Sequence, residues 1–271
     1  MDHPVLKRIA KTAFWLLMIH FIIEVSGHHY LYNTIDQTVL KGRLGPGIQE
    51  FEFMPNNSME IGEPEPWTKA ANYNNAVLTS EESAHHESNE SVSFIVIKKD
   101  HLLFEQYWQG FDKTSISNSF SMAKSIVSLL IGIAVDRGEI NSIDDPVFLY
   151  LPQYETELGK KLKVRHLLNM SSGINFDEHY LNPFAFPARA NYGDNLELLL
   201  EKYEVREEPG EVFIYQSGTT QVLGFLLKSA TRQNLSDYAS EHLWSKIGAE
   251  NPALWSLDHE GGIEKAFCCI N

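Results

Sequence analysis

The sequence places a serine and a lysine three residues apart, in Ser121-Met122-Ala123-Lys124, at the start of a long apolar run. Three residues is just under one helical turn, so the two side chains share a helix face and can meet. A serine at a helix N-terminus also lies among free backbone N–H groups, which favour developing negative charge. The pair can therefore act as a nucleophile with an adjacent amine. The alternative is that Ser121 caps the helix and Lys124 is solvated, since about one accidental match is expected in a chain of this length.

Such a pair needs a rigid helix to hold it, and the sequence predicts one over 119–138. Gly138 suits the position just past the helix C-terminus. The apolar residues of this segment recur at helical spacing, as shown by Val127, Leu130, Ile131, Ala134 and Val135.

The remaining patterns predict an α+β fold with segregated layers. Two β-rich runs, 92–99 and 101–108, nearly abut at Lys99-Asp100 and predict a hairpin. Further helical patterns follow the long helix, at 164–170, 194–203, 219–231 and 236–247.

Three stretches of the sequence carry a family resemblance. They read SFSMAKSIVSLLIGIAVDRGEINSIDDPVFLYLPQ at 119–153, VRHLLNMSSGI at 164–174 and PGEVFIYQSGTTQVLGFLL at 209–227. Residues 92–271 resemble the serine β-lactamase and penicillin-binding-protein superfamily, in its class C β-lactamase-like group, which includes D-alanyl-D-alanine peptidases, esterases and hydrolases of 6-aminohexanoate oligomers. The resemblance implies a β-lactamase/transpeptidase-like fold, with a helical region packed on an antiparallel sheet. It also implies that the serine is acylated while the lysine assists.

The family's second motif is Tyr-x-Asn or Tyr-x-Ser, and three positions match it. The match at 180–182 falls in a proline-containing loop, and the match at 238–240 lies inside a helical pattern. The match at 215–217 follows a Pro-Gly turn and a strand-like run, VFIY, and then leads into a helix. We therefore assign Tyr215 to catalysis and Ser217 to substrate binding; the alternative for Tyr215 is a half-buried structural aromatic.

The chemistry requires a neutral amine. A lysine with its reference pKa of about 10.4 is almost always protonated at pH 7, so the pKa must fall by about three units for the amine to act as a base. Tyr215 faces a similar problem. The resemblance implies that Lys124 and Tyr215 share the proton transfer, and the sequence leaves open which of them takes the first proton.

Composition excludes several other functions. The formal net charge is −14 and no dense basic patch is present, so we expect no nucleic-acid partner. The acidic and histidine clusters at 85–87 and 258–260 read as polar loop and turn, so we expect neither a metal nor another cofactor. His166 is expected to be structural. Cys268 and Cys269 are expected to be two small buried residues that do not pair with each other.

The N-terminal sequence predicts that the protein is targeted to the membrane or exported. Basic residues precede an apolar run at 13–23, so residues 1–27 read as a signal peptide or, alternatively, as an uncleaved membrane anchor. The domain is then exported, either free outside the cytoplasm or attached to the membrane. Residues 28–91, rich in Pro, Asn, Glu and Ser, predict an extended linker, and 92–271 the hydrolase-like domain.

The family's third motif, a Lys/His-x-Gly strand, does not follow Tyr215 in this sequence. We therefore expect an incomplete sheet and a C-terminally truncated chain. The predicted function is a serine hydrolase acting through an acyl-enzyme on a small amide or ester, such as short amide oligomers or D-alanyl peptides. The alternatives are an inactive ligand-binding or interaction module, or a non-functional fragment. The sequence predicts no oligomeric state.

Overall fold

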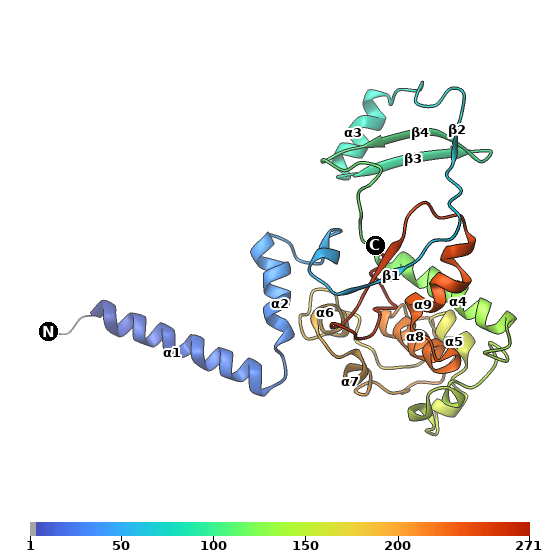
Figure 1. Ribbon diagram of the computed structural model, residues 1–271. Helices are drawn as coiled ribbons and strands as arrows, with labels where there is room; N and C mark the ends of the chain where they lie inside the picture. The colour runs from blue at the N-terminus through green and yellow to red at the C-terminus, as the bar shows by residue number, and fades with distance from the viewer. Residues whose placement is uncertain (1–3) are drawn as a thin grey trace.

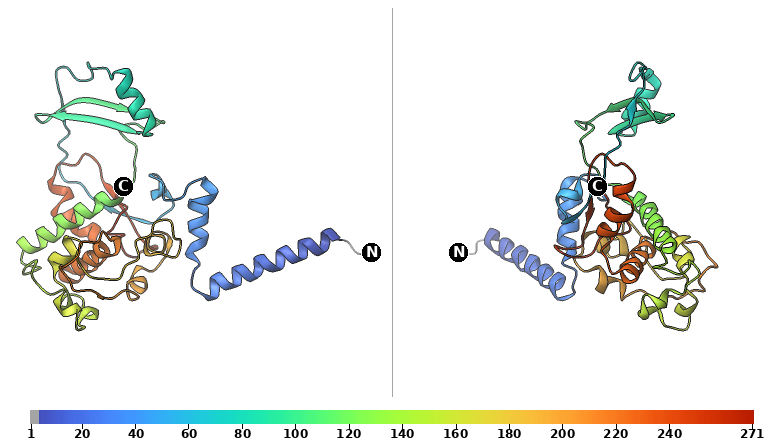
Figure 2. Two further views of the ribbon diagram at one scale, coloured as in Figure 1. Left: turned by 180° about the vertical axis from the view of Figure 1, so that it is seen from behind. Right: turned by 45° about the vertical axis from the view of Figure 1, so that its right-hand side comes forward.

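The computed structural model describes residues 4–271 and has three parts. A helical body forms most of the molecule, a small sheet stands at one end of it, and the helix α1 (Pro4–Val25) projects away from it (Figures 1 and 2). After a bend, α2 (Tyr30–Gln37) returns along the body and contacts α6 (Phe186–Tyr192). α1 is therefore joined to the body through the segment that contains α2.

The body is built on two buried helices, α4 (Ala123–Asp136) and α8 (Ser217–Thr231), which contact each other. α8 also contacts α5 (Val164–Leu168) and α9 (Leu235–His242). The apolar face predicted for the first of these helices is confirmed, because Val127, Leu130, Ile131 and Ala134 are buried. Gly138, just past this helix, has a φ of 75°, a conformation that glycine adopts without strain.

Two small sheets accompany the helices. β1 (Asn56–Met59) pairs antiparallel with β5 (Ala253–Ser256), and α9 contacts β1. β3 (Ser93–Lys98) and β4 (His101–Tyr107) form the predicted antiparallel hairpin, and β2 (Thr68–Lys69) adds in parallel to β4. Lys99 and Asp100 both have positive φ, as a two-residue hairpin turn requires. The α+β prediction is confirmed, but the sheet against which a body helix packs is β1–β5, whereas the hairpin sheet stands apart in Figure 1.

The remaining elements are short. They include two short helices, α3 (Ser80–Ser88) and α7 (Leu196–Leu200). There are also single turns of 3-10 helix at Val39–Lys41, Glu50–Glu52, Phe120–Met122, Val147–Leu149, Pro152–Tyr154, Gly159–Lys161 and Trp244–Lys246.

The segment 28–91 differs from the extended linker that its composition predicts. It contains α2, β1, β2 and α3, and β1 is part of the body. The polar run that starts α3 is helical because Thr79 and Glu82 form a capping box, each side chain hydrogen-bonding the other's backbone N–H. In addition, the ring of His86 stacks on Trp108, with centroids 4.8 Å apart. Local capping and aromatic contact thus order a segment of low hydrophobicity.

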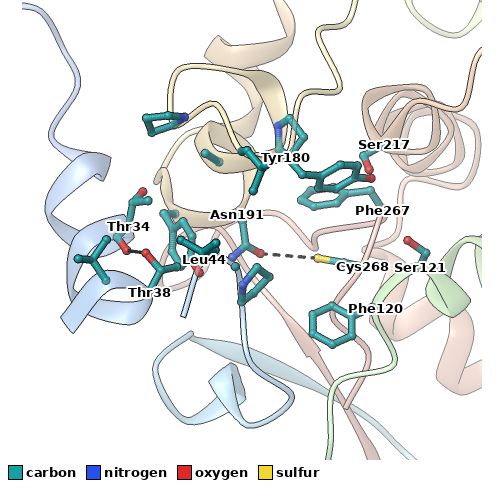
Figure 3. Close-up of a pocket in the computed structure, with 18 residues that line it drawn as sticks. Thr34, Thr38, Leu44, Phe120, Ser121, Tyr180, Asn191, Ser217, Phe267 and Cys268 are labelled. Atoms are coloured by element: carbon teal, nitrogen blue, oxygen red, sulfur yellow. Dashed lines mark hydrogen bonds between the residues drawn. The ribbon is translucent and has the colours of Figure 1, made fainter. Parts of the chain in front are cut away.

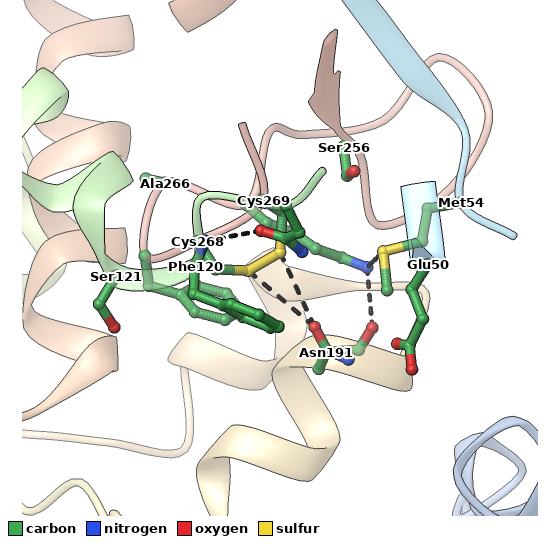
Figure 4. The surroundings of a disulfide bond; sticks show 12 residues. Glu50, Met54, Phe120, Ser121, Asn191, Ser256, Ala266, Cys268 and Cys269 are labelled. Carbon is green, nitrogen blue, oxygen red and sulfur yellow. Dashed lines mark hydrogen bonds between the residues drawn. A yellow bond between two sulfur atoms is a disulfide. The ribbon is translucent and has the colours of Figure 1, made fainter. Parts of the chain in front are cut away.

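The prediction that the two cysteines stay unpaired is wrong. Cys268 and Cys269 form a disulfide with each other, although both are buried as expected (Figure 4). Cys269 has a φ of 73°, so the chain turns sharply at this residue. Both sulfurs face the side-chain oxygen of Asn191 on α6, at 4.0 and 3.8 Å.

A second buried feature next to the disulfide is Lys265, only 2% exposed. Its Nζ donates to the backbone oxygen of Asn191 at 2.8 Å and contacts the sulfur of Met54 at 3.1 Å. Burial lowers the pKa of Lys265 to about 8, because Asp258 and Glu50 favour the ammonium only partly. Below this pH, folding therefore buries a charged amine.

The lowered pKa of Lys265 leads us to expect an unusual pH dependence of the free energy of unfolding. In the unfolded chain its pKa is 10.5, so between pH 8 and 10.5 the unfolded state binds more protons than the folded state. The free energy of unfolding should therefore rise with pH across this window, by about 2 to 3 kcal/mol in total. Urea unfolding of the protein and of Lys265→Met at several pH values checks this.

The substitution removes a hydrogen bond at every pH, which adds only a constant offset. All other titratable groups are common to both proteins, so the difference between the two curves isolates Lys265. Parallel curves from pH 7.5 to 10 would contradict the prediction.

The membrane expectation for 13–23 falls on α1, and residues 1–3 of the predicted targeting segment lie outside the described residues. Within residues 4–271, no single helix is both long and apolar enough to cross a membrane. A pair bent by 118°, Leu6–Val25 with Tyr30–Lys41, reaches the required length and composition only when its two members are taken together.

Candidate active site

Ser121 and Lys124 lie on adjacent turns where a 3-10 helix runs into α4. The Nζ of Lys124 donates to the Oγ of Ser121 at 3.1 Å. Phe120 has a φ of 46°, which is uncommon for a residue with a side chain, and the buried Asn118 holds it there by accepting from its N–H at 2.7 Å. This sharp turn presents the Ser121 side chain at the surface of the body.

The amine of Lys124 is largely shielded from bulk water. Besides Ser121, it donates to the backbone oxygen of Phe267 at 2.6 Å. Burial lowers the pKa of Lys124, while Tyr215 and Glu178 oppose this shift by favouring the ammonium. The sequence argument required a lysine with a depressed pKa, and the structure provides the depression through burial rather than through nearby positive charge.

Tyr215, just before α8, and Ser217, its first residue, reach the same place. The Nζ of Lys124 lies over the Tyr215 ring, 5.2 Å from its centroid, and 41% of this tyrosine is exposed. Ser217, 3% exposed, begins α8, and its backbone N–H donates to the Oε2 of Glu178 at 2.9 Å. The structure therefore brings together all four side chains chosen from the sequence.

The approach to Tyr215 is not the strand that VFIY predicts. After the turn at 209–210, residues 211–216 run extended without a strand partner. This run is tied to the body by the hydrogen bond from Ile214 N–H to the Met170 oxygen at 2.8 Å and by the buried Gln216 side chain, which donates to two backbone oxygens. Its apolar side chains remain largely exposed.

Two residues near the site were missed. Tyr180, in the match set aside because of its proline loop, lines the same cavity as Ser121 and Ser217. Its hydroxyl donates to the Oε1 of Glu178 at 2.7 Å, and burial raises the pKa of Tyr180 to about 12. Glu178 thus connects this loop to the start of α8. No local pattern marks it, since its partners lie 39 residues away or on its own exposed loop.

Three other residues that the sequence analysis kept out of the site make structural contacts. Tyr238 is buried within α9 and donates to Glu139, so the 238–240 match is structural. His166 accepts from the Lys163 N–H at 3.3 Å at the start of α5, and burial lowers the pKa of its ring. Asp258 closes a turn by accepting from the Ile263 N–H at 2.7 Å.

A cavity of about 260 Å³ opens beside Ser121 (Figure 3). Ser121, Ser217 and Phe267 lie at one end, and Thr34, Thr38 and Leu44 lie at the other. The last three belong to the segment that was expected to be a linker. This segment is therefore one wall of the candidate site.

Comparison with known proteins identifies the family of the chain. Residues 80–261 match the Beta-lactamase family, and the chain belongs to it. The 6-aminohexanoate-dimer hydrolase of Paenarthrobacter ureafaciens is 25% identical over 180 residues, covering 62% of this chain and 45% of that protein. An Escherichia coli K12 protein named "Putative D-alanyl-D-alanine carboxypeptidase" is 24% identical over 182 residues, covering 58% of this chain and 42% of its own length.

A solved structure from Bacillus anthracis, titled "Putative 6-aminohexanoate-dimer hydrolase", superimposes with a TM-score of 0.68 at 20% identity. The match covers 83% of this chain and 64% of that one, and it confirms the β-lactamase/transpeptidase-like fold. The chain spans less than half the length of the two curated relatives.

Glu178 offers a test of the site's electrostatics. Its carboxylate favours the Lys124 ammonium, so Glu178→Gln should lower the pKa of Lys124 further, while the amide oxygen can still accept from Ser217 and Tyr180. A ¹³C NMR titration of the Lys124 ε-carbon measures this shift. Glu157→Gln, at an exposed position, is the matched control and should leave the pKa where it is. An unchanged or raised pKa in Glu178→Gln would refute the assignment.

Proposed function

We propose that this chain carries the catalytic centre of a serine hydrolase that cleaves a small amide or ester through an acyl-enzyme. The observation that carries the proposal is the contact of 3.1 Å between the Lys124 amine and the Ser121 hydroxyl, made by a lysine whose pKa is lowered by burial. A structural cap with a solvated lysine would not remove the amine from water. Membership of the Beta-lactamase family supports the same reaction class.

The proposed reaction follows from these contacts. The Oγ of Ser121 attacks the substrate carbonyl carbon, and its proton passes to the basic group formed by Lys124 and Tyr215. The same pair returns the proton to the leaving amine or alcohol as the bond to the carbonyl breaks. Water then attacks the acyl-enzyme, one proton is again taken up by the pair and returned to Ser121, and the carboxylic acid leaves.

Ser217 is proposed to contact the substrate. It begins α8, lines the cavity together with Ser121, and is held by the hydrogen bond between its backbone and Glu178. The names of the relatives suggest short amide oligomers or D-alanyl peptides as substrates. A non-catalytic ligand-binding module with the same cleft is the competing function.

Ser121→Ala and Lys124→Met test the proposal. Removing the nucleophile or its base from a serine-hydrolase site lowers turnover by at least about 10³-fold, and the two losses are far from additive. Hydrolysis of p-nitrophenyl acetate and intact-protein mass spectrometry after exposure to a fluorophosphonate are the measurements. We expect one covalent adduct on the protein and none on either variant.

Ser128→Ala is the matched control, because Ser128 is an exposed serine further along α4. It should keep both turnover and labelling. If the unmodified protein neither turns over the ester nor takes up the label, the catalytic proposal fails and the non-catalytic module takes its place.

We also propose that the chain is exported, with α1 acting as a secretory signal or as an anchor. The proposal is supported by the large apolar side chains that α1 leaves exposed, among them Leu16, Leu17 and Phe21. Fusion of residues 1–50 to an alkaline phosphatase that is active only outside the cytoplasm provides the test. Activity should be lost when Leu16 and Leu17 are both replaced by Asp, and activity that survives this change would contradict export through α1.

A further inference from the structure

We propose that the cavity beside Ser121 binds the acyl group of an uncharged, apolar ester or amide, and that the N-terminal segment 34–46 limits which acyl groups fit. This inference rests on the proposed function for the identity of the reacting atom. It goes further by choosing among substrate classes, since the names of the relatives point to substrates that carry free charges.

The walls of the cavity contain no charged side chain among the described residues. Half of the eighteen lining residues have apolar side chains, among them Val39, Leu44, Phe120, Leu181 and Phe267. A carboxylate or ammonium placed against these walls would lose part of its water without gaining an ionic partner, which is unfavourable. The lining therefore selects for neutral groups.

Four hydroxyls of the cavity lining are already used inside the protein, namely those of Thr34, Thr38, Tyr180 and Tyr192. Thr34 donates to the Tyr30 backbone oxygen and Thr38 donates to the Thr34 backbone oxygen, both within α2 and the turn after it. Tyr192 donates to Glu50, and Tyr180 donates to Glu178. With their only protons committed, these groups have none to offer to a ligand.

The positions of the two ends of the cavity indicate where the acyl group would lie. Ser121 and Ser217 lie at one end and the segment containing Thr34, Thr38 and Leu44 lies at the other, with Asn191 between them (Figure 3). A carbonyl carbon placed at the Ser121 Oγ leaves the rest of the acyl group pointing along the apolar walls. The volume of about 260 Å³ suits a small group rather than a long polymer.

Segment 34–46 forms the far wall of the cavity, opposite Ser121, and specific contacts with the body hold it in position. The Tyr30 hydroxyl donates to the Pro183 oxygen at 3.0 Å, and the Asn33 side chain donates to the Tyr192 oxygen at 3.2 Å. Arg43 pairs with the buried Glu50 at 3.1 Å. These contacts fix the wall, so it can set a limit on acyl size and charge.

Binding to the full chain carrying Ser121→Ala tests the inference without turnover. Ligand-observed NMR titrations with butanamide, hexanamide and octanamide should show affinity rising about fourfold for each added methylene until the cavity is full. The half-amide of the eight-carbon diacid has a carboxylate in place of the terminal methyl group of octanamide. It should bind at least about tenfold more weakly than octanamide at pH 7. Equal or tighter binding of this acid, a flat length series, or no binding by any amide would overturn the inference.

A charge introduced on the far wall gives a second, independent reading. Leu44 is 82% exposed and lines the cavity, so Leu44→Lys should fold and should narrow the preference for octanamide over the half-amide by about two- to fivefold. Leu40→Lys is the matched control, because Leu40 is 72% exposed on the adjacent 3-10 turn but does not line the cavity. If both variants narrow the preference equally, the added charge acts on binding from any surface position. Segment 34–46 would then not determine which acyl groups bind.

These outcomes are separable from those of the catalytic proposal. Labelling of Ser121 tests the nucleophile, whereas the amide titrations use a protein without it. Loss of labelling together with a steep length series would remove the hydrolase and keep an apolar-ligand site. Normal labelling with a preference for the charged ligand would keep the hydrolase and remove this substrate class.

Discussion

The proposed reaction requires the amine of Lys124 to be shielded from water beside the Ser121 hydroxyl, and contacts from distant parts of the chain hold it there. Its two hydrogen bonds go to Ser121 and to the backbone oxygen of Phe267. The second acceptor lies 143 residues further along the chain, so the position of the amine depends on how the C-terminal stretch is held. A neutral amine accepts this setting more readily than an ammonium because it loses less solvation energy.

The C-terminal stretch is fastened to both helices that carry the site. The Ser119 N–H donates to the Ile270 oxygen at 2.8 Å, directly before the serine–lysine turn. From α8, the buried Gln221 side chain donates to the Glu264 oxygen and accepts from the Ala266 N–H. The same helix approaches so closely at Gly224 that a Cβ there would lie 2.7 Å from the Cβ of Ala266. Backbone polar groups and one glycine thus bring Phe267 to Lys124.

What could be predicted from the sequence was local. The buried face of α4 follows from helical spacing, and the hairpin from two β-rich runs around Lys99-Asp100. Ser121, Lys124, Tyr215 and Ser217 were found because their motifs are short. The wall at 34–46 and Glu178 were not found, since their roles arise from contacts across the chain, such as Asn33 with Tyr192. The helix after Thr79 could have been predicted from its capping box. The polar composition of this segment instead led to the prediction of a linker.

A partly buried lysine and a fully buried one show why a lowered pKa does not by itself identify a catalytic group. Burial lowers the pKa of both Lys124 and Lys265, and the latter is the more deeply buried. Lys265 contacts a backbone oxygen and a thioether, neither of which can be deprotonated to give a nucleophile. Lys124 instead contacts a hydroxyl presented at the surface of the body, next to a cavity that opens to solvent. The neighbouring atom and its access to substrate, rather than the electrostatic shift alone, therefore distinguish a catalytic lysine from a structural one.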